Sequence, residues 1–385
     1  MFVWDSDPKP VLDELRMYPN VVSRRSIQEC IDYLLGLEKE KRFALVVGNC
    51  ADPFLLESPE LWGKTVPQYP NGIPHFVRNV DPLSVMIDCI TSVRDTVYYA
   101  DKDRKFGLFL RYSNFFKPRS DSGRVFRGMG VNRPDDLTYD PQRMLTAYHE
   151  TAMRVRKTQD WEEEGEHRNV RVWHASEWLQ EDYERAVSNK VGYDMWQSGT
   201  HLRWIGARSA KVSNFTEINL PSEHYQPFAL KIDSTISLFC LAYVMAALES
   251  KGWKRPLILV SRLGVDNMHK LPVLMEHAAT VAERFDFHKV LWMVDPQHGN
   301  TIKMGGKKVR PLSHVQSEML HFLETCDAMN VHPAGMWLEA NFTESCHEED
   351  DPDSLCDPRL PSHQTAELLK SWTTEFRDIM TRRQS

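Results

Sequence analysis

Eight short apolar runs, most of them followed by a helical pattern, constrain the fold more than any other feature of this 385-residue chain. Continuous apolar runs of this length are typical of strands that are buried on both faces of a sheet. Strands that alternate with helices predict a parallel sheet covered by helices, and eight such units predict a (β/α)8 TIM barrel. The eight runs are 43–47, 106–110, 170–173, 202–205, 228–230, 257–260, 290–294 and 335–338.

The segments between the runs carry apolar residues at near-helical spacing. Asp140 and Pro141 are typical of a helix start, and the spacing of Ser313 and Gln316 predicts a capping box. The helix at 234–251 is the most apolar and is expected to be well buried. The predicted helices cover about 26–41, 83–99, 140–157, 178–187 and 234–251, one ends near 285, and two begin near 313 and 362.

We expect two regions, an N-terminal extension with a helix at 1–42 and the barrel at 43–385. A doubly wound sheet is the alternative fold. No GxGxxG motif follows a predicted strand, which removes the main support for a dinucleotide-binding version of that alternative.

Charge and composition exclude several classes of protein. The formal net charge is −7, and a balance of this kind disfavours non-specific nucleic-acid binding. No apolar run is long enough for a membrane helix, and the N-terminus lacks the pattern of a secretory signal. We therefore expect a cytoplasmic protein that binds neither nucleic acid nor membrane, with its seven cysteines reduced. We also expect a homodimer that forms through exposed barrel helices.

Polar side chains follow the apolar runs at the points where the strands should end. Barrel enzymes carry their chemistry at these C-terminal strand ends. His298 illustrates the pattern, because it lies just past the run 290–294 in the turn DPQHGNT. The residues collected in this way are Cys50, Arg111, Lys117, Arg119, Arg208, Lys231, Arg262, His298, Glu339 and Asp357.

Four of these side chains form a potential metal-binding set: Cys50, His298, Glu339 and Asp357. One thiolate, one imidazole and two carboxylates suit Mn, Co, Fe or Zn better than Mg or Ca, which prefer oxygen ligands alone. The four residues are far apart in sequence, so only the barrel can bring them together.

The other exit residues are cations. A group of cations at one barrel mouth is costly unless anions neutralise it, and phosphate or carboxylate ligands are the natural partners. For any single one of the other cations, an ordinary surface role or an ion pair is the favoured interpretation. Binding is favoured for Lys231 and Arg262, which directly follow apolar strands.

The sequence resembles the class II 3-deoxy-D-arabino-heptulosonate 7-phosphate (DAHP) synthases, a family of metal-dependent barrels. The matching stretches run in family order from about residue 43 to residue 370, and the most specific of them are DPQHGNT and CDPRL. The others are GNCADPF, FFKPRSDSGR, FRGMGVN, DPQRMLTAYHETA, LRWIGARSAKV, LKIDSTI, LVSRLGVD, GGKKVRP, VHPAGMWLEANFTES and LCDPRLPSHQTAELL.

The resemblance implies condensation of phosphoenolpyruvate (PEP) with erythrose 4-phosphate, which gives DAHP and inorganic phosphate. It places the metal, Mn or Co before Zn or Fe, on the same four residues. Arg208, Lys231 and Arg262 would bind PEP. Arg119 and Ser120 would hold the phosphate of the aldehyde substrate, and Lys117 would lie near the reacting groups as a candidate for proton transfer.

The sequence departs from the family pattern at the expected barrel mouth. Ala207 stands where the family has a glutamate, and Trp337 stands where it has a histidine. Arg111 is one position out of register with the family arginine, and Ala334 and Ser345 replace a glycine and a cysteine. The metal-binding set is intact.

Three hypotheses remain from the sequence. The first is a DAHP synthase of the shikimate pathway or of a secondary-metabolite branch. The second is a related enzyme that joins PEP to a different aldehyde, which Ala207 and Trp337 would allow. The third is a non-catalytic barrel that serves as a partner of another enzyme, and this hypothesis predicts that no metal is bound.

Overall fold

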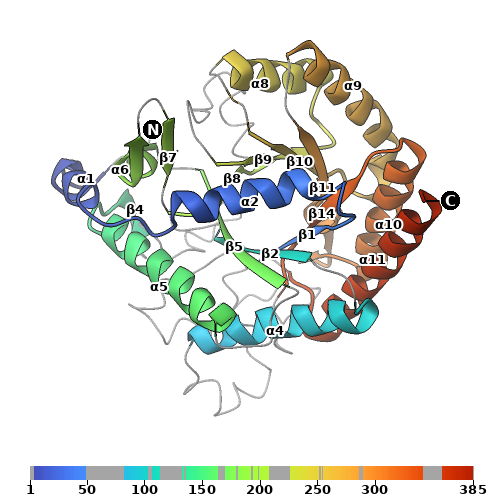
Figure 1. Cartoon of the computed structure of the whole chain (residues 1–385), viewed down its shortest axis with the longest axis horizontal. Helices are drawn as coiled ribbons and strands as arrows, with labels where there is room; N and C mark the ends of the chain where they lie inside the picture. Colours follow the sequence, from blue (N-terminus) through green and yellow to red (C-terminus); the bar gives the residue numbers. More distant parts are fainter. Residues whose placement is uncertain are drawn as a thin grey trace.

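A computed structural model shows the fold of the chain. It describes residues 4–48, 82–102, 106–112, 132–133, 136–163, 170–178, 181–191, 194–197, 199–207, 226–250, 253, 255–285, 289–340 and 358–384. Eight parallel strands form a closed barrel with helices around it, which confirms the predicted (β/α)8 architecture (Figure 1). In order around the barrel the strands are β1 (Ala44–Val47), β14 (Pro333–Leu338), β11 (Val290–Val294), β10 (Leu257–Arg262), β9 (Phe228–Asp233), β8 (Leu202–Ile205), β5 (Val170–Glu177) and β2 (Phe106–Tyr112).

Helices surround the strands, and three small antiparallel hairpins extend from the loops. The helices are α1 (Lys9–Leu15), α2 (Arg24–Gly36), α4 (Pro82–Ala100), α5 (Arg143–Glu163), α6 (Glu181–Ala186), α8 (Leu238–Ser250), α9 (Leu271–Arg284), α10 (Leu312–Ala328) and α11 (Ser362–Arg382), with 3-10 turns η3 (Val265–Lys270) and η4 (His298–Asn300). The hairpins pair β3 (Asn132–Arg133) with β4 (Asp136–Tyr139), β6 (Ser188–Val191) with β7 (Asp194–Gln197), and β12 (Ile302–Met304) with β13 (Lys307–Val309).

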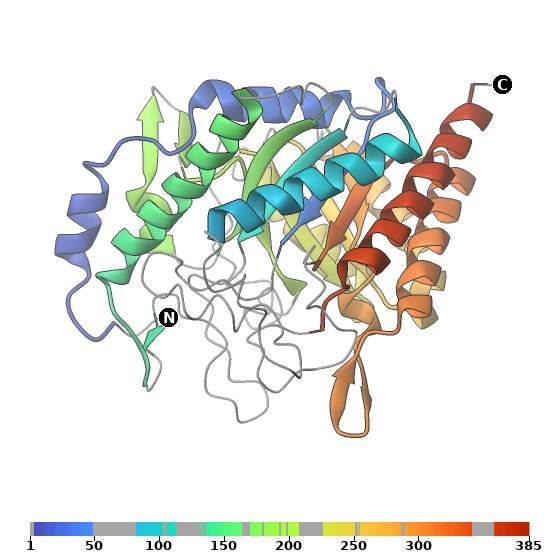
Figure 2. The same ribbon diagram turned by 90° about the horizontal axis from the view of Figure 1, so that it is seen from below.

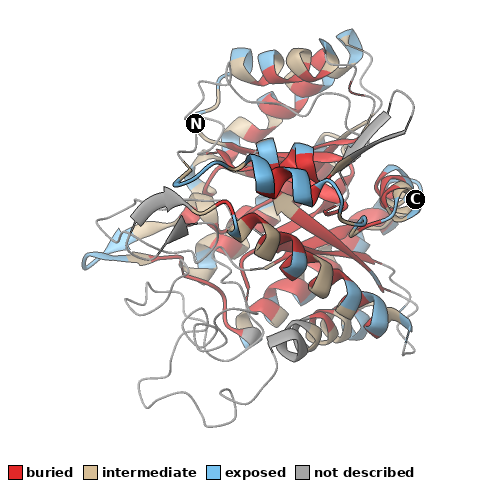
Figure 3. Ribbon diagram, turned by 90° about the vertical axis from the view of Figure 1, so that its left-hand side faces the viewer, coloured by how far each residue is buried: buried red, intermediate tan, exposed pale blue. Residues whose placement is uncertain are grey.

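The strands are buried on both faces because their side chains alternate between two cores (Figure 3). Leu45, Leu108 and Leu259 point outward and pack with the surrounding helices. Val46, Phe109 and Trp337 belong to a second apolar cluster that fills the barrel. Successive side chains of a strand point to opposite faces, so the residue two positions after an inward apolar side chain also points inward.

Helix α2 closes the N-terminal end of the barrel. Its Cys30, Leu34 and Leu37 belong to the same apolar cluster as the inward side chains of the strands. The Tyr33 hydroxyl donates a hydrogen bond of 2.6 Å to the Phe43 carbonyl. Figures 1 and 2 show α2 lying across this end, while the β12–β13 hairpin extends from the other end. The C-terminal ends of the strands are therefore the end that is left for a site.

Several local predictions were wrong. Ser313 and Gln316 form no capping box, since α10 begins at Leu312 after Pro311 without a side-chain cap, and Gln316 instead donates to Glu367. Asp140 accepts a hydrogen bond from the Gln142 backbone, but α5 begins only at Arg143.

Helix α8 is less buried than its composition predicts. Leu241, Val244, Met245 and Leu248 are buried, but Phe239 is 77% exposed. Helix α1 and the hairpins had no prediction, because they are short and carry little periodic signal. No helix in the described part of the chain is both long and apolar enough to cross a membrane. The division at residues 42 and 43 stays a prediction.

Candidate active site

The candidate site is the inward layer that lies directly beyond the apolar filling of the barrel. Two positions after Phe109, Ala175, Ala229, Val260, Met293 and Trp337 stand Arg111, Glu177, Lys231, Arg262, Asp295 and Glu339. The alternation that fills the barrel with apolar side chains therefore ends in a layer of charged ones. At the β1 exit this position is Gly48, where a Cβ would lie 2.6 Å from the Arg111 carbonyl oxygen.

Lys231 and Asp295 form a buried ion pair at the base of this layer, with 2.5 Å between Nζ and Oδ2. The indole rings of Trp204 and Trp337 lie beside the ammonium group, at 5.2 and 4.7 Å from Nζ to the ring centroids. Burial lowers the pKa of Lys231 to about 7 even though Asp295 opposes this shift. Lys231 can therefore change its charge near neutral pH.

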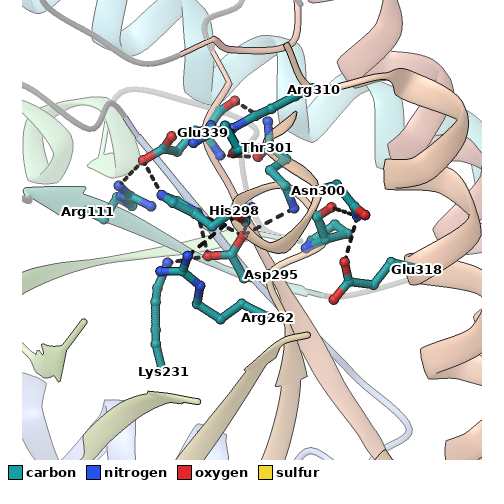
Figure 4. A network of polar contacts seen from close by, with 12 residues as sticks. Arg111, Lys231, Arg262, Asp295, His298, Asn300, Thr301, Arg310, Glu318 and Glu339 are labelled. Carbon is teal, nitrogen blue, oxygen red and sulfur yellow. Dashed lines mark hydrogen bonds and ion pairs between the residues drawn. The ribbon is translucent and has the colours of Figure 1, made fainter. Parts of the chain in front are cut away.

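His298 lies between two carboxylates (Figure 4). Its Nδ1 is 2.7 Å from Asp295 Oδ2, and its Nε2 is 3.0 Å from Glu339 Oε1. Burial lowers the pKa of His298 below its ordinary value, although both carboxylates oppose the shift. A neutral ring carries one N–H, and if Nδ1 donates it to Asp295, the lone pair of Nε2 faces a carboxylate oxygen. Two facing acceptors are a geometry that a cation between them would satisfy.

Glu339 is the centre of the charged network. Its Oε1 accepts a hydrogen bond of 2.7 Å from Arg111, and its Oε2 accepts one of 2.6 Å from Arg310. Burial opposes ionisation of Glu339, but His298, Arg310 and Arg111 hold its pKa well below its usual range. Arg310 also donates to the carbonyl of Pro358. This arginine therefore connects Glu339 to the residue that follows Asp357.

The backbone around His298 and Glu339 is fixed by side-chain amides. Gln297 donates to the Glu339 carbonyl at 2.8 Å and accepts from the Glu339 amide at 2.5 Å. Asp295 also accepts hydrogen bonds from the backbone amides of Gln297 and His298. The two strand ends that carry His298 and Glu339 are therefore joined directly, independently of any bound ligand.

The structure brings together five of the residues selected from the sequence: Arg111, Lys231, Arg262, His298 and Glu339. Arg262 lies beside the η4 turn, where its guanidinium donates to the His298 carbonyl at 3.4 Å. The remaining selected residues, Cys50, Lys117, Arg119, Ser120, Arg208 and Asp357, lie outside the described residues. Among the described residues alone, no three acidic, histidine or cysteine side chains form a metal-binding group.

Four functional candidates were missed by the sequence reasoning. Asp295 was interpreted only as part of a turn, although its position three residues before His298 in DPQH could have indicated contact with the imidazole. Arg310 and Glu318 carry no local signal, since their partners lie on other strands and loops. Glu177 is a further buried carboxylate of the inward layer.

Comparison with known proteins identifies the family. The model of the class II DAHP synthetase family matches residues 151–371, which is more than half of the chain. The chain belongs to the class II DAHP synthetase family. Members of this family are transferases of aromatic biosynthesis, so the chain is an enzyme. The hypothesis of a non-catalytic barrel is therefore set aside.

Three proteins that are similar to this chain have low sequence identity to it. A probable phospho-2-dehydro-3-deoxyheptonate aldolase of Pseudomonas fluorescens is 27% identical, with 67% of this chain and 70% of that protein covered. The aldolase AroG of Mycolicibacterium smegmatis is 24% identical over 95% of this chain and 89% of its own. The solved structure of a phospho-2-dehydro-3-deoxyheptonate aldolase from Francisella tularensis covers 98% of this chain and 97% of its own, with a TM-score of 0.53. At 15% identity, that structure supports the fold alone.

Proposed function

We propose that the enzyme condenses PEP with erythrose 4-phosphate in a metal-dependent reaction, giving DAHP and inorganic phosphate. The observation that carries this proposal is the inward layer at the strand ends. It places an imidazole and a carboxylate 3.0 Å apart, next to the cations Lys231 and Arg262. A metal-binding pair beside anion-binding groups is what a reaction between two phosphorylated substrates requires.

The metal would be held by His298 and Glu339, together with Cys50 and Asp357. The described donors fit this role, because Asp295 orients the ring of His298 and two arginines stabilise the ionised form of Glu339. When bound, a divalent ion such as Mn or Co supplies Lewis acidity toward the aldehyde oxygen. Zn and Fe suit the same ligands.

The residues of the chain have separate tasks in the proposed reaction. Arg208, Lys231 and Arg262 bind PEP through its anionic groups, with Arg111 as a further cation near Glu339. Arg119 and Ser120 hold the phosphate of the aldehyde, and Lys117 moves a proton near the reacting carbons. C3 of PEP attacks the aldehyde carbon, whose oxygen takes up a proton, and water adds at C2 to give a hemiketal phosphate. The bond between C2 and the phosphate oxygen then breaks, inorganic phosphate leaves, and the C2 hydroxyl loses its proton to become the ketone of DAHP.

A different aldehyde is the second candidate substrate. Two observations favour it, since Ala207 is a buried small residue at the β8 exit and Trp337 is a fully buried indole beside Lys231. Both stand where the family has polar side chains. Different side chains at these two positions alter the space and the hydrogen bonds that are available to the aldehyde. The cations proposed to bind PEP are unchanged.

Phosphate release from PEP, measured with Mn²⁺ and a panel of aldehydes, separates the two candidates. We expect the highest kcat/KM with erythrose 4-phosphate. Activity confined to another aldehyde would replace the first candidate with the second, and no phosphate release with any aldehyde would contradict both. The homodimer and the cytoplasmic location stay predictions.

A further inference from the structure

A buried carboxylate outside the inward layer connects the two loops that carry Arg262 and His298. Glu318 lies on α10, and its side chain is fully buried. Its Oε1 accepts hydrogen bonds from the backbone amides of Leu263 and Gly264, at 2.9 and 3.2 Å. These two residues directly follow Arg262, so Glu318 fixes the backbone that carries this arginine out of β10.

The same carboxylate reaches the turn that carries His298. Its Oε2 accepts a hydrogen bond of 2.6 Å from the Asn300 side chain (Figure 4). Asn300 also donates to the Pro296 carbonyl at 2.7 Å, and its Oδ1 accepts from the Val265 amide at 3.0 Å. Glu318 and Asn300 are therefore hydrogen-bonded to each other and to both loops, the one that follows Arg262 and the one that carries His298. We call this pair the loop clamp.

The two loops also touch through their backbones. A Cβ on Gly299 would lie 2.2 Å from the Gly264 nitrogen, and a Cβ on Gly264 would lie 2.7 Å from the Gly299 carbonyl oxygen. Such contacts leave no room for one loop to slide past the other. The backbone that follows Arg262 is therefore in direct contact with the turn that carries His298.

Glu318 is an expensive residue for a purely structural role. Among the described residues no cation pairs with it. Burial and the negative charge of Asp295 raise the pKa of Glu318 to about 8, while the hydrogen bonds from Gly264, Leu263 and Asn300 oppose the shift. A buried carboxyl group costs desolvation free energy that an apolar side chain on α10 would avoid. What the carboxylate adds is three directed hydrogen bonds to the two loops.

We propose that Glu318 is a positioning residue whose hydrogen bonds to Leu263, Gly264 and Asn300 set Arg262 and His298 in one fixed relation. PEP binding and metal binding then depend on the same clamp. This inference rests on the proposed function, because it takes Arg262 as a PEP-binding residue and His298 as a metal ligand.

The variant Glu318→Gln tests the clamp with little change in volume. Its amide oxygen can still accept from Leu263 and Gly264, but its NH2 group faces the NH2 group of Asn300. Rotation of the Asn300 amide would break its bonds to Pro296 and Val265, so the variant loses the link between the loops. Asn300→Ala breaks the link from the other side and serves as the second variant.

The readouts are the dissociation constants of PEP and of Mn²⁺, measured by calorimetry on the whole chain. Each is expected to rise about tenfold or more in both variants, the range typical of residues that orient a ligand-binding side chain. The control Glu324→Gln changes an exposed carboxylate on the same helix and is expected to leave both constants unchanged. A purely structural role would lower the melting temperature without weakening either ligand in the folded protein, and that result would overturn the inference.

A double variant tests whether Glu318 acts through Arg262. In an Arg262→Lys background, Glu318→Gln is expected to weaken PEP binding by less than threefold, since the contribution of the arginine is already lost. If Glu318→Gln weakened PEP binding as much in the Arg262→Lys background as in the wild type, Glu318 would not act through Arg262. If the wild type bound Mn²⁺ but no PEP, the proposed function would fail, and the Mn²⁺ constants would still decide the role of the clamp. A wild type that bound neither would overturn both.

Discussion

At the scale of single residues, Asp295 connects the two chemical parts of the site. One carboxylate contacts both Lys231 and the Nδ1 atom of His298. Burial opposes its ionisation, but His298 and Lys231 hold the pKa of Asp295 well below its ordinary range. It therefore supplies a fixed negative charge that fixes the orientation of the imidazole and neutralises the lysine.

The variant Asp295→Asn tests this double role. We expect kcat to fall about 10- to 100-fold, and Mn²⁺ to bind more weakly, because the imidazole loses its oriented partner. Steady-state kinetics and metal titration measure the two effects. Asp378→Asn, which changes an exposed carboxylate on α11, is the control. Unchanged kcat and Mn²⁺ affinity in Asp295→Asn would contradict the assignment.

The affinity for PEP should depend on pH through Lys231. Burial lowers the pKa of this lysine to about 7, so it is charged below that pH and largely neutral above it in the free enzyme. An anionic ligand binds the charged form, and we therefore expect the dissociation constant of PEP to rise between pH 7 and pH 9. Calorimetry across this range measures it. In Lys231→Arg the rise should disappear, because a guanidinium stays charged, and a rise that persists would assign the effect to another group.

The sequence predicted only some of the residues of the candidate site, for a physical reason. His298, Glu339, Lys231 and Arg262 could be selected because each lies near the C-terminal end of a strand or shortly after it, and parallel strands bring these ends together. Arg310 and Glu318 could not be found, because Arg310 reaches Glu339 from the end of a hairpin and Glu318 reaches two loops from a helix. Contacts of that kind depend on packing that no local pattern records.

At the scale of elements, the close approach of the β10 exit to the η4 turn requires glycine. Gly264 has φ +81°, and a Cβ there would also meet the Gly299 carbonyl oxygen. Gly305 in the β12–β13 hairpin has φ +56° but nothing within 4 Å of an added Cβ. Both glycines have a positive φ, but Gly264 also has ψ 147°, and only Gly264 would bring an added Cβ into contact with the neighbouring loop.

Alanine at these two positions compares a positive-φ site in open space with a positive-φ site that is also crowded. Gly305→Ala should cost about 1–2 kcal/mol of unfolding free energy, from the backbone conformation alone. The loss of unfolding free energy in Gly264→Ala should exceed that in Gly305→Ala by about 1–3 kcal/mol, because the added methyl group overpacks a buried contact. Urea unfolding measures both. Equal losses would show that the contact between the two loops tolerates a Cβ.

Helix α2 should affect stability and leave the chemistry unchanged, because it packs at the end of the barrel opposite the site. Leu34→Ala removes a fully buried side chain and is expected to lower the unfolding free energy by about 2–5 kcal/mol. Leu35→Ala changes the neighbouring residue, which is 42% exposed, and should cost less than about 1 kcal/mol. The KM for PEP should be the same in both variants, and an increase confined to Leu34→Ala would contradict the separation.

At the scale of the whole molecule, the alternation of apolar runs with helical segments predicted most of the architecture. The runs at 43–47 and 290–294 become the strands β1 and β11, shifted by at most one residue. Helix starts were less predictable, since α10 begins without the capping box that Ser313 and Gln316 suggested. The exposed Phe239 of α8 shows that apolar composition alone does not determine burial.

The central claim is that the strand ends form one metal-dependent site for joining PEP to an aldehyde. The most direct measurement is the yield of DAHP and of phosphate from PEP and erythrose 4-phosphate, with purified protein and Mn²⁺. We predict that the two products form in equal amounts and that chelation of the metal, or the variant Glu339→Gln, abolishes both. Equal product yields that persist after complete removal of the metal, or phosphate release without the seven-carbon product, would contradict the account.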